Sequence, residues 1–504
     1  MSRRDQEKLY AAITGIREAL IEQAQSTPLR EEKRRRAWRR PAAAAACLCL
    51  LAGAGAWGLT HVRMGSAGGG NGGHGEGTAF LSYAGPVFPL ALAETAEHVD
   101  AARTVTLDFS AFCQVPETVH SRGWDTTVAV TDETVLTNHG QEDAAVTAVY
   151  PFPASLRQLD AGSLPAVTVD GLPAETRLLA GTEMGYTGSW EDYRDGLTEN
   201  TLSAALSETP EAELLSRPVT VYALDNARVT AGEGSNPCLT VETTVDPTRT
   251  SLFTWGFHIG GQDLVDQHTS RLSEGYSIPK PGEKDWGTRY IIVMGQDLTD
   301  YTVQGYQNGS LKPGEDLEAA VDITRTETTF GEILRQVAEL WYQDREGQDD
   351  TVSFDLWFTL FCRDFAARLP EPGAAMDLNG WPGDWLEEAF SWCDTADRVF
   401  YLAFDLVIPA GGSAVVTAEL TKEASFDYHC AGTENQGVYG YDLMTRHPGG
   451  NLTFTAQTVR LTHTDRVEIL RQNLGFDLEA GITAVPLDPG QEHYYLEVRR
   501  TEEP

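Results

Sequence analysis

The sequence predicts a mainly β protein with a helical insertion, and three observations support this class. From about residue 79 onward, most segments alternate apolar and polar side chains with the period of two that a half-buried strand requires. These segments are rich in β-branched residues, and Gly, Pro, Asn or Asp separates them. Only between about 328 and 395 does the period become that of a helix. We therefore expect an antiparallel β-sandwich-like region with a helical insertion, preceded by an amphipathic helix and one transmembrane helix.

The first predicted element is an amphipathic helix over residues 5–25, DQEKLYAAITGIREALIEQAQ. Apolar side chains recur there at spacings of four, three and four, which aligns them in one stripe. Gly15 weakens the helix by about 1 kcal/mol relative to Ala, so alone in water it is marginal. Such a helix is typical of a segment that lies on a membrane or docks into a partner's groove. The expected partner-binding residues are Leu9, Ile13, Ile16 and Leu20.

A basic block directly precedes the least polar segment of the chain. Residues 41–60 carry no charged side chain and as a helix would span about 30 Å, the thickness of a bilayer's hydrocarbon core. Only Arg63 follows closely, so the positive-inside rule keeps residues 1–40 in the cytoplasm and exports the rest. Each cation near an anionic leaflet adds about 1 kcal/mol of attraction, which makes membrane lipid an expected partner. The membrane-flanking block consists of Lys33, Arg34, Arg35, Arg36, Arg39 and Arg40.

Three other interpretations of the apolar run compete with a retained membrane anchor. A cleaved signal peptide could use Ala54-Gly55-Ala56 as its cleavage site, but about 40 residues precede the run. A lipoprotein site at Cys47 would need apolar residues before the cysteine, where only alanines stand. A buried Ala-rich helix of a soluble protein leaves the basic block unexplained. We therefore expect a single-pass cell-membrane protein with a cytoplasmic N-terminus and an extracellular C-terminal region.

The N-terminal run carries a family resemblance. LYAAITGIREALIEQA, followed by the basic block and one span, resembles the N-terminal region of clostridial single-pass proteins that are anti-sigma-factor-like. The pattern Leu-x-x-x-Ile-x-x-Ile-x-x-x-Leu-Ile-Glu covers about 20 of the 504 residues. Gly15 and Arg17 replace acidic residues that are usual in the middle of the family's segment. The resemblance implies a Gram-positive source, a cytoplasmic sigma factor or other regulator as partner, and an exported domain of variable kind.

A glycine-rich linker, GSAGGGNGGHGEG at 65–77, separates the predicted span from the folded part. Its thirteen residues span about 20 Å as a flexible chain. The predicted organisation is a cytoplasmic helix and basic segment over 1–40, a transmembrane helix over 41–60, a Gly-rich linker over 61–78, a β-sandwich-like region over 79–327, a helical insertion over 328–395 and a C-terminal β region over 396–504.

Strand patterns fill the region before and after the helical insertion. Asp170-Gly171 between two of them is a strong hairpin signal. The stretch TVLTNHGQEDAAVTAVYPFPASL, followed by VTVDGLPAE, resembles a recurrent sandwich element of exported bacterial and extracellular adhesion-type domains. The predicted strands occupy 102–110, 126–138, 144–152, 166–179, 218–224, 238–245, 251–259, 289–295, 300–306, 398–408, 414–420, 451–462 and 493–499.

The predicted helical insertion concentrates aromatic residues. Over 328–343 the helical period places four side chains on one face, and 354–369 is apolar nearly all round. Five of the eleven tryptophans fall here, which indicates either core packing or an aromatic surface that recognises a sugar, a peptide or a protein. The expected face consists of Ile333, Val337, Leu340 and Trp341. The five tryptophans are Trp341, Trp357, Trp381, Trp385 and Trp392.

No motif in the chain identifies a reaction, so we expect no enzyme, no cofactor and no metal site. Ser277-Ile278-Pro279-Lys280 matches Ser-x-x-Lys, but its prolines oppose the helical turn which that chemistry needs. The loop DREGQDD at 344–350 carries four carboxylates that could hold Ca²⁺, although a solvated acidic turn explains them as well. Of the seven cysteines, only Cys362 and Cys393 fall in neighbouring predicted helices.

The distribution of charge sets the expected class of function. The formal net charge is -36; residues 1–40 carry +5, which leaves -41 for the remainder. So acidic a region repels phosphates, which excludes nucleic acid as a partner. We expect an envelope sensor or regulator that couples the exported region to a cytoplasmic partner. A surface binding or structural module without signalling is the alternative, with an unknown extracellular ligand in either case, and an exported enzyme comes third.

Overall fold

The computed structural model of the protein describes part of the chain, and all of that part belongs to a unit that begins at Gly68. None of its helices is long and apolar enough to cross a membrane. The predicted helix at 5–25, the span at 41–60 and the linker at 65–77 lie outside the described residues. Strands and antiparallel sheets dominate, so the mainly β class is confirmed. The described residues are 84–113, 126–160, 162–183, 212–230, 236–280, 287–307, 317–344, 351–369, 386–427 and 437–501.

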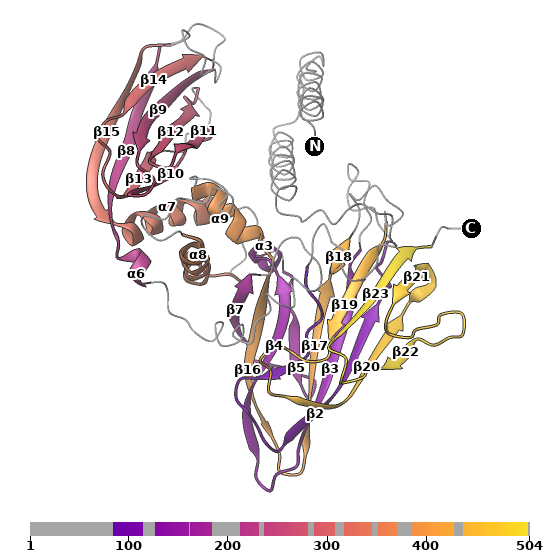
Figure 1. Ribbon diagram of the computed structural model, residues 1–504. Helices are drawn as coiled ribbons and strands as arrows, with labels where there is room; N and C mark the ends of the chain where they lie inside the picture. Colours follow the sequence, from indigo (N-terminus) through magenta and orange to yellow (C-terminus); the bar gives the residue numbers. More distant parts are fainter. Residues whose placement is uncertain are drawn as a thin grey trace. The chain divides into compact units, whose positions relative to one another are not determined.

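The largest sheet combines strands from the beginning and the end of the described chain (Figure 1). Strand β2 pairs antiparallel with β3 on one side and parallel with β20 on the other. Every second side chain of β2 is buried, as the alternating sequence predicts. The strands in order are β22 (Ala484–Pro486), β20 (Thr453–Thr462), β2 (Val99–Asp108), β3 (Val128–Asn138), β17 (Ser413–Lys422), β5 (Ala166–Val169) and β6 (Leu172–Pro173).

Two four-stranded sheets share cores with the large sheet. We call these three sheets together the first β-region. Ala101 and Leu136 of the large sheet share one core with Tyr150 of the first, and Val105 shares another with Leu496 of the second. The first sheet is β1 (Ala91–Leu92), β4 (Ala144–Ala154), β16 (Arg398–Ile408) and β7 (Arg177–Glu183), in that order. The second is β18 (Phe426–Asp427), β19 (Tyr439–Met444), β23 (His493–Arg500) and β21 (Val467–Gln472), with the 3-10 helix η1 (Thr464–Arg466) before β21.

The rest of the chain is inserted between two strands that pair with each other. β7 precedes the insertion and β16 follows it, yet they are antiparallel neighbours with Leu179 opposite Tyr401. A second insertion lies within the first, because β8 begins at Pro218 and β15 ends at Thr329, directly opposite it. Strands before and after the insertions therefore share sheets.

The inner insertion is a second β-region of two four-stranded sheets. Leu224 and Val293 of one sheet meet Leu239 and Leu272 of the other in a common core. One sheet is β10 (Thr250–Trp255), β13 (Arg289–Gly295), β8 (Pro218–Val229) and β15 (Ala319–Thr329). The other is β11 (Ile259–Asp266), β12 (Thr269–Ser277), β9 (Pro237–Val245) and β14 (Thr302–Gln307). We call residues 218–329 the inserted β-region.

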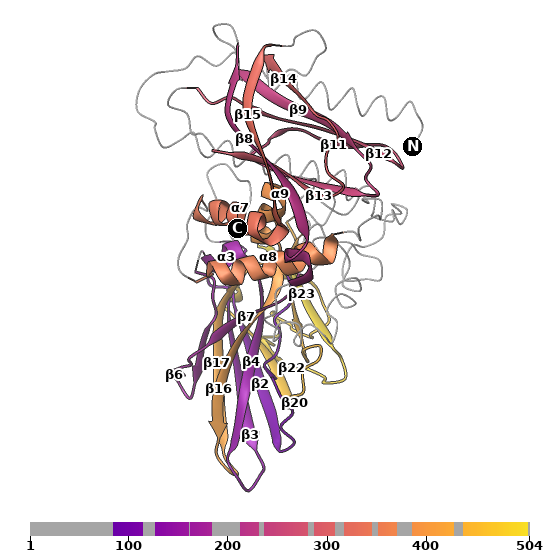
Figure 2. The same ribbon diagram turned by 90° about the vertical axis from the view of Figure 1, so that its left-hand side faces the viewer.

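Helices connect the two β-regions (Figure 2). One apolar core contains side chains from helices α7, α8 and α9 together with strands of both regions. Helix α8 begins at a capped end, where the Ser353 hydroxyl accepts from the backbone N–H of Leu356 at 3.2 Å. The helices are α3 (Leu156–Asp160), α6 (Ala212–Leu215), α7 (Phe330–Asp344), α8 (Phe354–Arg368) and α9 (Leu386–Thr395).

Helix α7 differs in one position from the predicted face. Ile333 and Val337 are buried, but Leu340 is 44% exposed. The buried side chains include Phe330, Leu334 and Ala338, which moves the centre of the apolar face away from Leu340. A helix turns by about 100° per residue, so Leu340 falls at the margin of that face. Leu340 was wrongly placed because the spacing alone does not fix the direction of the core.

Two of the five tryptophans named above pack in the apolar core. Trp357 is fully buried, and Trp341 packs against the same core. Their indole N–H groups donate to the two carboxylate oxygens of Asp394 on α9, at 2.7 Å from Trp357 and 3.0 Å from Trp341. Arg368 lies over the Trp392 ring, with its guanidinium carbon 5.9 Å from the ring centroid. Trp381 and Trp385 lie outside the described residues.

Candidate functional site at the attachment of the N-terminal segment

The residues that the sequence singles out for function lie outside the described part of the chain. This holds for the partner-binding stripe Leu9, Ile13, Ile16 and Leu20, and for the basic block Lys33, Arg34, Arg35, Arg36, Arg39 and Arg40. The first described residues after the predicted linker are 84–92. We call these residues the attachment segment, because any link between the predicted membrane anchor and the folded region passes through them.

The attachment segment is built into the core of the first β-region. Residues 85–92, GPVFPLAL, are all buried. The N–H of Ala84 donates to the carbonyl of Ser425 at 2.6 Å, and Val87 forms a parallel bridge with Leu443 of β19. Further along, β1 pairs antiparallel with β4. The segment thus passes from one four-stranded sheet to the other, and both hold it by backbone hydrogen bonds.

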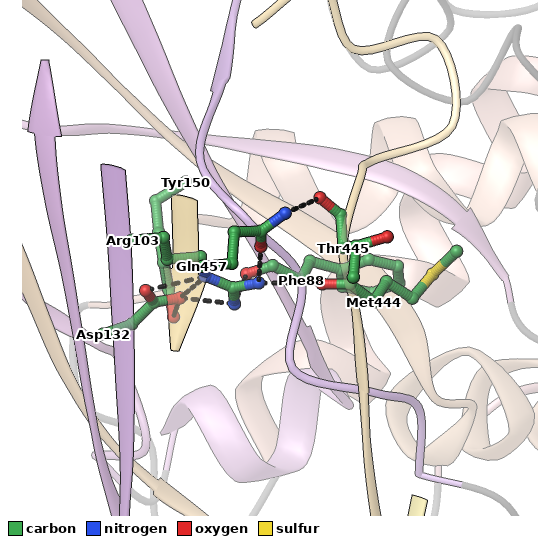
Figure 3. A network of polar contacts seen from close by, with 7 residues as sticks. All are labelled: Phe88, Arg103, Asp132, Tyr150, Met444, Thr445 and Gln457. Carbon is green, nitrogen blue, oxygen red and sulfur yellow. Dashed lines mark hydrogen bonds and ion pairs between the residues drawn. The ribbon is translucent and has the colours of Figure 1, made fainter. Parts of the chain in front are cut away.

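A buried arginine fixes the middle of this segment (Figure 3). The guanidinium of Arg103 forms a two-pronged ion pair with Asp132, with Nε–Oδ1 at 2.9 Å and Nη2–Oδ2 at 2.7 Å. It also donates to the carbonyls of Phe88 at 3.0 Å and of Met444 at 2.7 Å. Both charged side chains are at most 1% exposed. One cation therefore joins β2 and β3 to the attachment segment and to β19.

The remaining groups of the network complete the hydrogen bonding of this buried pair. Gln457 accepts from Arg103 Nη1 at 3.4 Å and donates to the carbonyl of Thr445 at 2.7 Å. The Tyr150 hydroxyl donates to Asp132 Oδ2 at 3.4 Å. Burial and the Asp132 carboxylate raise the pKa of Tyr150 well above its ordinary value, so the phenol stays protonated. A buried ion pair whose groups are hydrogen-bonded avoids most of the cost of leaving water.

A second buried cation lies at the beginning of the attachment segment. Lys422, the last residue of β17, donates from Nζ to the carbonyl of Ala84 at 3.3 Å and to that of Glu423 at 3.2 Å. Burial lowers the pKa of Lys422 to about 8, although the carboxylate of Asp442 opposes this shift. The Oδ2 of Asp442 lies at hydrogen-bond distance, 2.8 Å, from His493 Nε2. Cations therefore hold carbonyls at two points of the segment.

An aromatic contact completes the site. The ring of His447 lies 5.4 Å from that of Phe88 and 5.5 Å from that of Tyr401, whose hydroxyl is 3.3 Å from His447 Nε2. Burial lowers the pKa of His447 to about 4, so the imidazole is neutral at neutral pH. The ring contacts thus add to the hydrogen bonds that hold Phe88 of the attachment segment in place.

The other candidates from the sequence are not brought together as a catalytic or metal centre. Ser277 ends a strand, and Lys280 Nζ bonds to Asn236 at 2.6 Å, whereas Ser277 Oγ lies 3.3 Å from His258 Nε2. Cys362 and Cys393 are both buried, and no disulfide joins them. Within the described ranges no group of three His, Cys, Asp or Glu side chains could hold a metal ion. Of the acidic loop only Asp344 is described.

The Arg103–Asp132 pair was missed at the level of sequence, although a signal for it exists. Arg103 and Asp132 both fall in the buried phase of strongly alternating strands. A charged residue in the inward phase of a strand predicts a buried ion pair. Naming its partner and the two carbonyls requires the fold.

Comparison with known proteins adds no identity to this geometry: no protein-family model matches the chain, and no curated protein matches it.

Proposed function

We propose that this chain is a membrane-anchored protein of the bacterial envelope that acts as a sensor or regulator. In this proposal residues 41–60 span the membrane once, and the exported residues fold as sandwich-like β-regions with a helical insertion. The helix at 5–25 then binds a cytoplasmic partner, such as a sigma factor, through its apolar stripe. The basic block before the span, with only Arg63 close after it, supports this topology.

The observation that carries the proposal furthest is the buried attachment segment. Residues 85–92 are buried without interruption, and the carbonyl of Phe88 is held by Arg103. Such an attachment suits a folded region that must stay joined to its anchor. The glycine-rich linker does not transmit a rigid motion, so we infer that the signal passes by assembly, release or proteolysis. Cleavage is then expected before residue 84.

A binding or structural module without signalling is the second candidate. The observation that favours it is the β11–β12 hairpin, where Leu264 and Val265 are 42% and 62% exposed. Apolar side chains at an exposed hairpin are typical of a surface that meets another molecule. A glycan and peptidoglycan binding screen of the full-length chain, with Leu264→Ser/Val265→Ser as the comparison, tests this candidate.

The topology is tested by protease treatment of intact cells that carry an epitope at the C-terminus. We expect loss of the epitope from intact cells, while an epitope before residue 40 survives until the cells are opened. A protected C-terminal epitope, or protein found only in the cytosolic fraction, would refute the anchored topology. Sequencing the fragments that remain in the membrane also shows whether cleavage falls before residue 84.

The partner-binding helix is tested by affinity capture with the full-length chain. The variant Ile13→Asp/Leu20→Asp places two charges on the apolar stripe. The matched control Ala11→Asp/Gln25→Asp places two charges on the opposite face. Since a helix turns by about 100° per residue, positions 11 and 25 point away from the apolar stripe. We expect the control to capture the same cytoplasmic partner as the wild type and the stripe variant to lose it. Equal capture by both variants would refute this role of the helix.

A further inference from the structure

The helices are joined to the two β-regions by different chemistry. Towards the first β-region the contacts are charge-assisted. Arg363 of α8 donates to the carbonyls of Ala180, at 3.0 Å, and of Gly181 in β7. Arg398 of β16 donates to Asp364 of α8 at 2.7 Å. These hydrogen bonds between charged side chains and strands hold α8 firmly on the first β-region.

Towards the inserted β-region the junction is mainly aromatic. The ring of Phe253 in β10 lies 5.3 Å from that of Phe330 in α7, and the ring of Trp255 lies 5.9 Å from that of Phe390 in α9. Few polar contacts accompany these rings among the described residues. One of them is the hydrogen bond from Gln336 to the Tyr290 hydroxyl at 2.8 Å. Another is made by Glu387.

Glu387 places a carboxyl group directly in this junction. It lies in the first turn of α9, and its Oε1 accepts the backbone N–H of Gly256 at the end of β10. Oε2 is buried and has no hydrogen-bond partner among the described residues. Gly256 adopts a positive φ of 84°, and a Cβ there would lie 2.7 Å from Arg289 Cγ. The close approach of the carboxyl group to the β10 backbone therefore depends on this glycine.

The surroundings disfavour a negative charge at this place. Burial raises the pKa of Glu387 to about 7, the Gly256 N–H opposes the shift, and neighbouring Glu388 adds to it. Arg289 on β13 lies beside Gly256, with its guanidinium carbon over the Tyr276 ring, 4.4 Å from the ring centroid. The other ionisable side chains on the elements packed against α9 are Arg157 and Asp160 on α3, Glu332, Arg335, Glu339, Tyr342 and Asp344 on α7, Asp355, Cys362, Arg363, Asp364 and Arg368 on α8, His258 after β10, and Cys393 and Asp394 on α9 itself.

We propose that Glu387 is a protonation latch between α9 and the inserted β-region. In the protonated state the carbonyl oxygen of the acid accepts the Gly256 N–H, and the second oxygen carries no charge into the apolar junction. Loss of the proton leaves a buried carboxylate that only two backbone N–H groups stabilise, those of Gly256 and of Glu387 itself, and separation of α9 from β10 lets water reach it. The junction therefore opens more often as the pH rises. The latch goes beyond the proposed function and does not depend on the membrane topology.

The size of the effect follows from proton linkage. An opened junction returns Glu387 to its ordinary pKa of 4.5, against about 7 when closed. The closed state is then favoured below pH 4.5, and this advantage is lost as the pH rises through 7. Between pH 5 and pH 8 the opening equilibrium is expected to increase about 70-fold.

Hydrogen exchange of the full-length chain in detergent micelles tests the latch. The readout is the protection factor of the amides in 250–256 and 386–395, corrected for the intrinsic pH dependence of exchange. We expect wild-type protection to fall about 70-fold from pH 5 to pH 8. Glu387→Gln keeps an acceptor for Gly256 but cannot ionise, so its protection should stay constant.

Glu388→Gln is the matched control, since it removes the adjacent carboxyl group and leaves Glu387 in place. It should keep most of the wild-type pH response. A wild type without the response, or a Glu387→Gln variant that retains it, would overturn the latch. If Glu387→Gln proves poorly folded, Glu387→Met provides a second non-ionising variant, and a pH response of the amides in 250–256 in that variant would equally refute the proposal.

Discussion

The stability of the fold towards acid is expected to depend on His447. Its imidazole is buried between Phe88 of the attachment segment and Tyr401, and burial lowers its pKa from 6.5 to about 4. Because the folded pKa is depressed, the unfolded chain takes up the proton first. The contribution of neutral His447 is therefore fully present above pH 6.5 and is lost as the pH falls through 4. Lowering the pH is the perturbation.

The magnitude follows from the two pKa values. At 1.36 kcal/mol per pH unit, linkage predicts a loss of about 2 kcal/mol at pH 5 and about 3 kcal/mol at pH 4 relative to pH 7.5. Since a domain is stable by about 5–15 kcal/mol in all, such a loss is easily measured. It adds to any other pH-dependent contribution, which the wild type and a variant at this position share.

The assay is urea denaturation at pH 7.5, 5 and 4 of the wild type and of His447→Gln. Gln cannot take up a proton, so the variant should lose less stability on acidification, by about 3 kcal/mol at pH 4. His139→Gln is the control: His139 is exposed and pairs with Asp100 at 2.8 Å, and its replacement should not reduce the acid loss. The reasoning is refuted when wild type and His447→Gln lose the same free energy of unfolding between pH 7.5 and pH 4.

Three further predictions concern the same β-region. Arg103→Met leaves Asp132 buried without its cation and should cost about 3–5 kcal/mol in urea denaturation; adding Asp132→Leu should restore most of it, and no recovery would contradict the ion-pair account. Lys422 has a folded pKa of about 8 against 10.5 unfolded, so the wild type should gain about 2–3 kcal/mol between pH 7 and pH 10, whereas Lys422→Met should lack this gain. Gly181→Ala would place a Cβ in steric conflict with the Val399 carbonyl oxygen, so thermal unfolding should show a destabilisation of about 1–3 kcal/mol; an unchanged unfolding midpoint would contradict this conflict.

Local structure could be predicted where the conformational preferences of a few adjacent residues determine it. Asp170-Gly171 forms the predicted hairpin turn, with both residues at positive φ between β5 and β6. The strand predicted over 251–259 instead ends at Trp255, because Gly256 takes a positive φ that breaks the ladder. Alternation identifies strands well, but it does not show where a single glycine interrupts one.

The pairing of strands far apart in the sequence could not be predicted, because the residues of one strand do not show which distant strand lies beside it. β2 and β20 both have the period of two, but both insertions lie between them in the sequence. Their parallel pairing is therefore visible only in the folded chain. The attachment site depends on the same long-range order, since Arg103 meets Met444 and Gln457 from the far end of the chain. The expected membrane anchor, partner helix and regulatory role remain predictions of the sequence.

The nested order of the chain has a consequence for its biosynthesis. Asp132 follows Arg103 by only 29 residues, but Gln457 follows it by 354. At 5–20 residues per second, the ribosome delivers Gln457 roughly 20–70 s after Arg103. During that interval one flank of β2 is an unpaired strand edge, a recognised starting point for aggregation. A chaperone that shields nascent edges should therefore raise the yield of this protein more than that of a β protein whose neighbours in the sheet are also neighbours in translation.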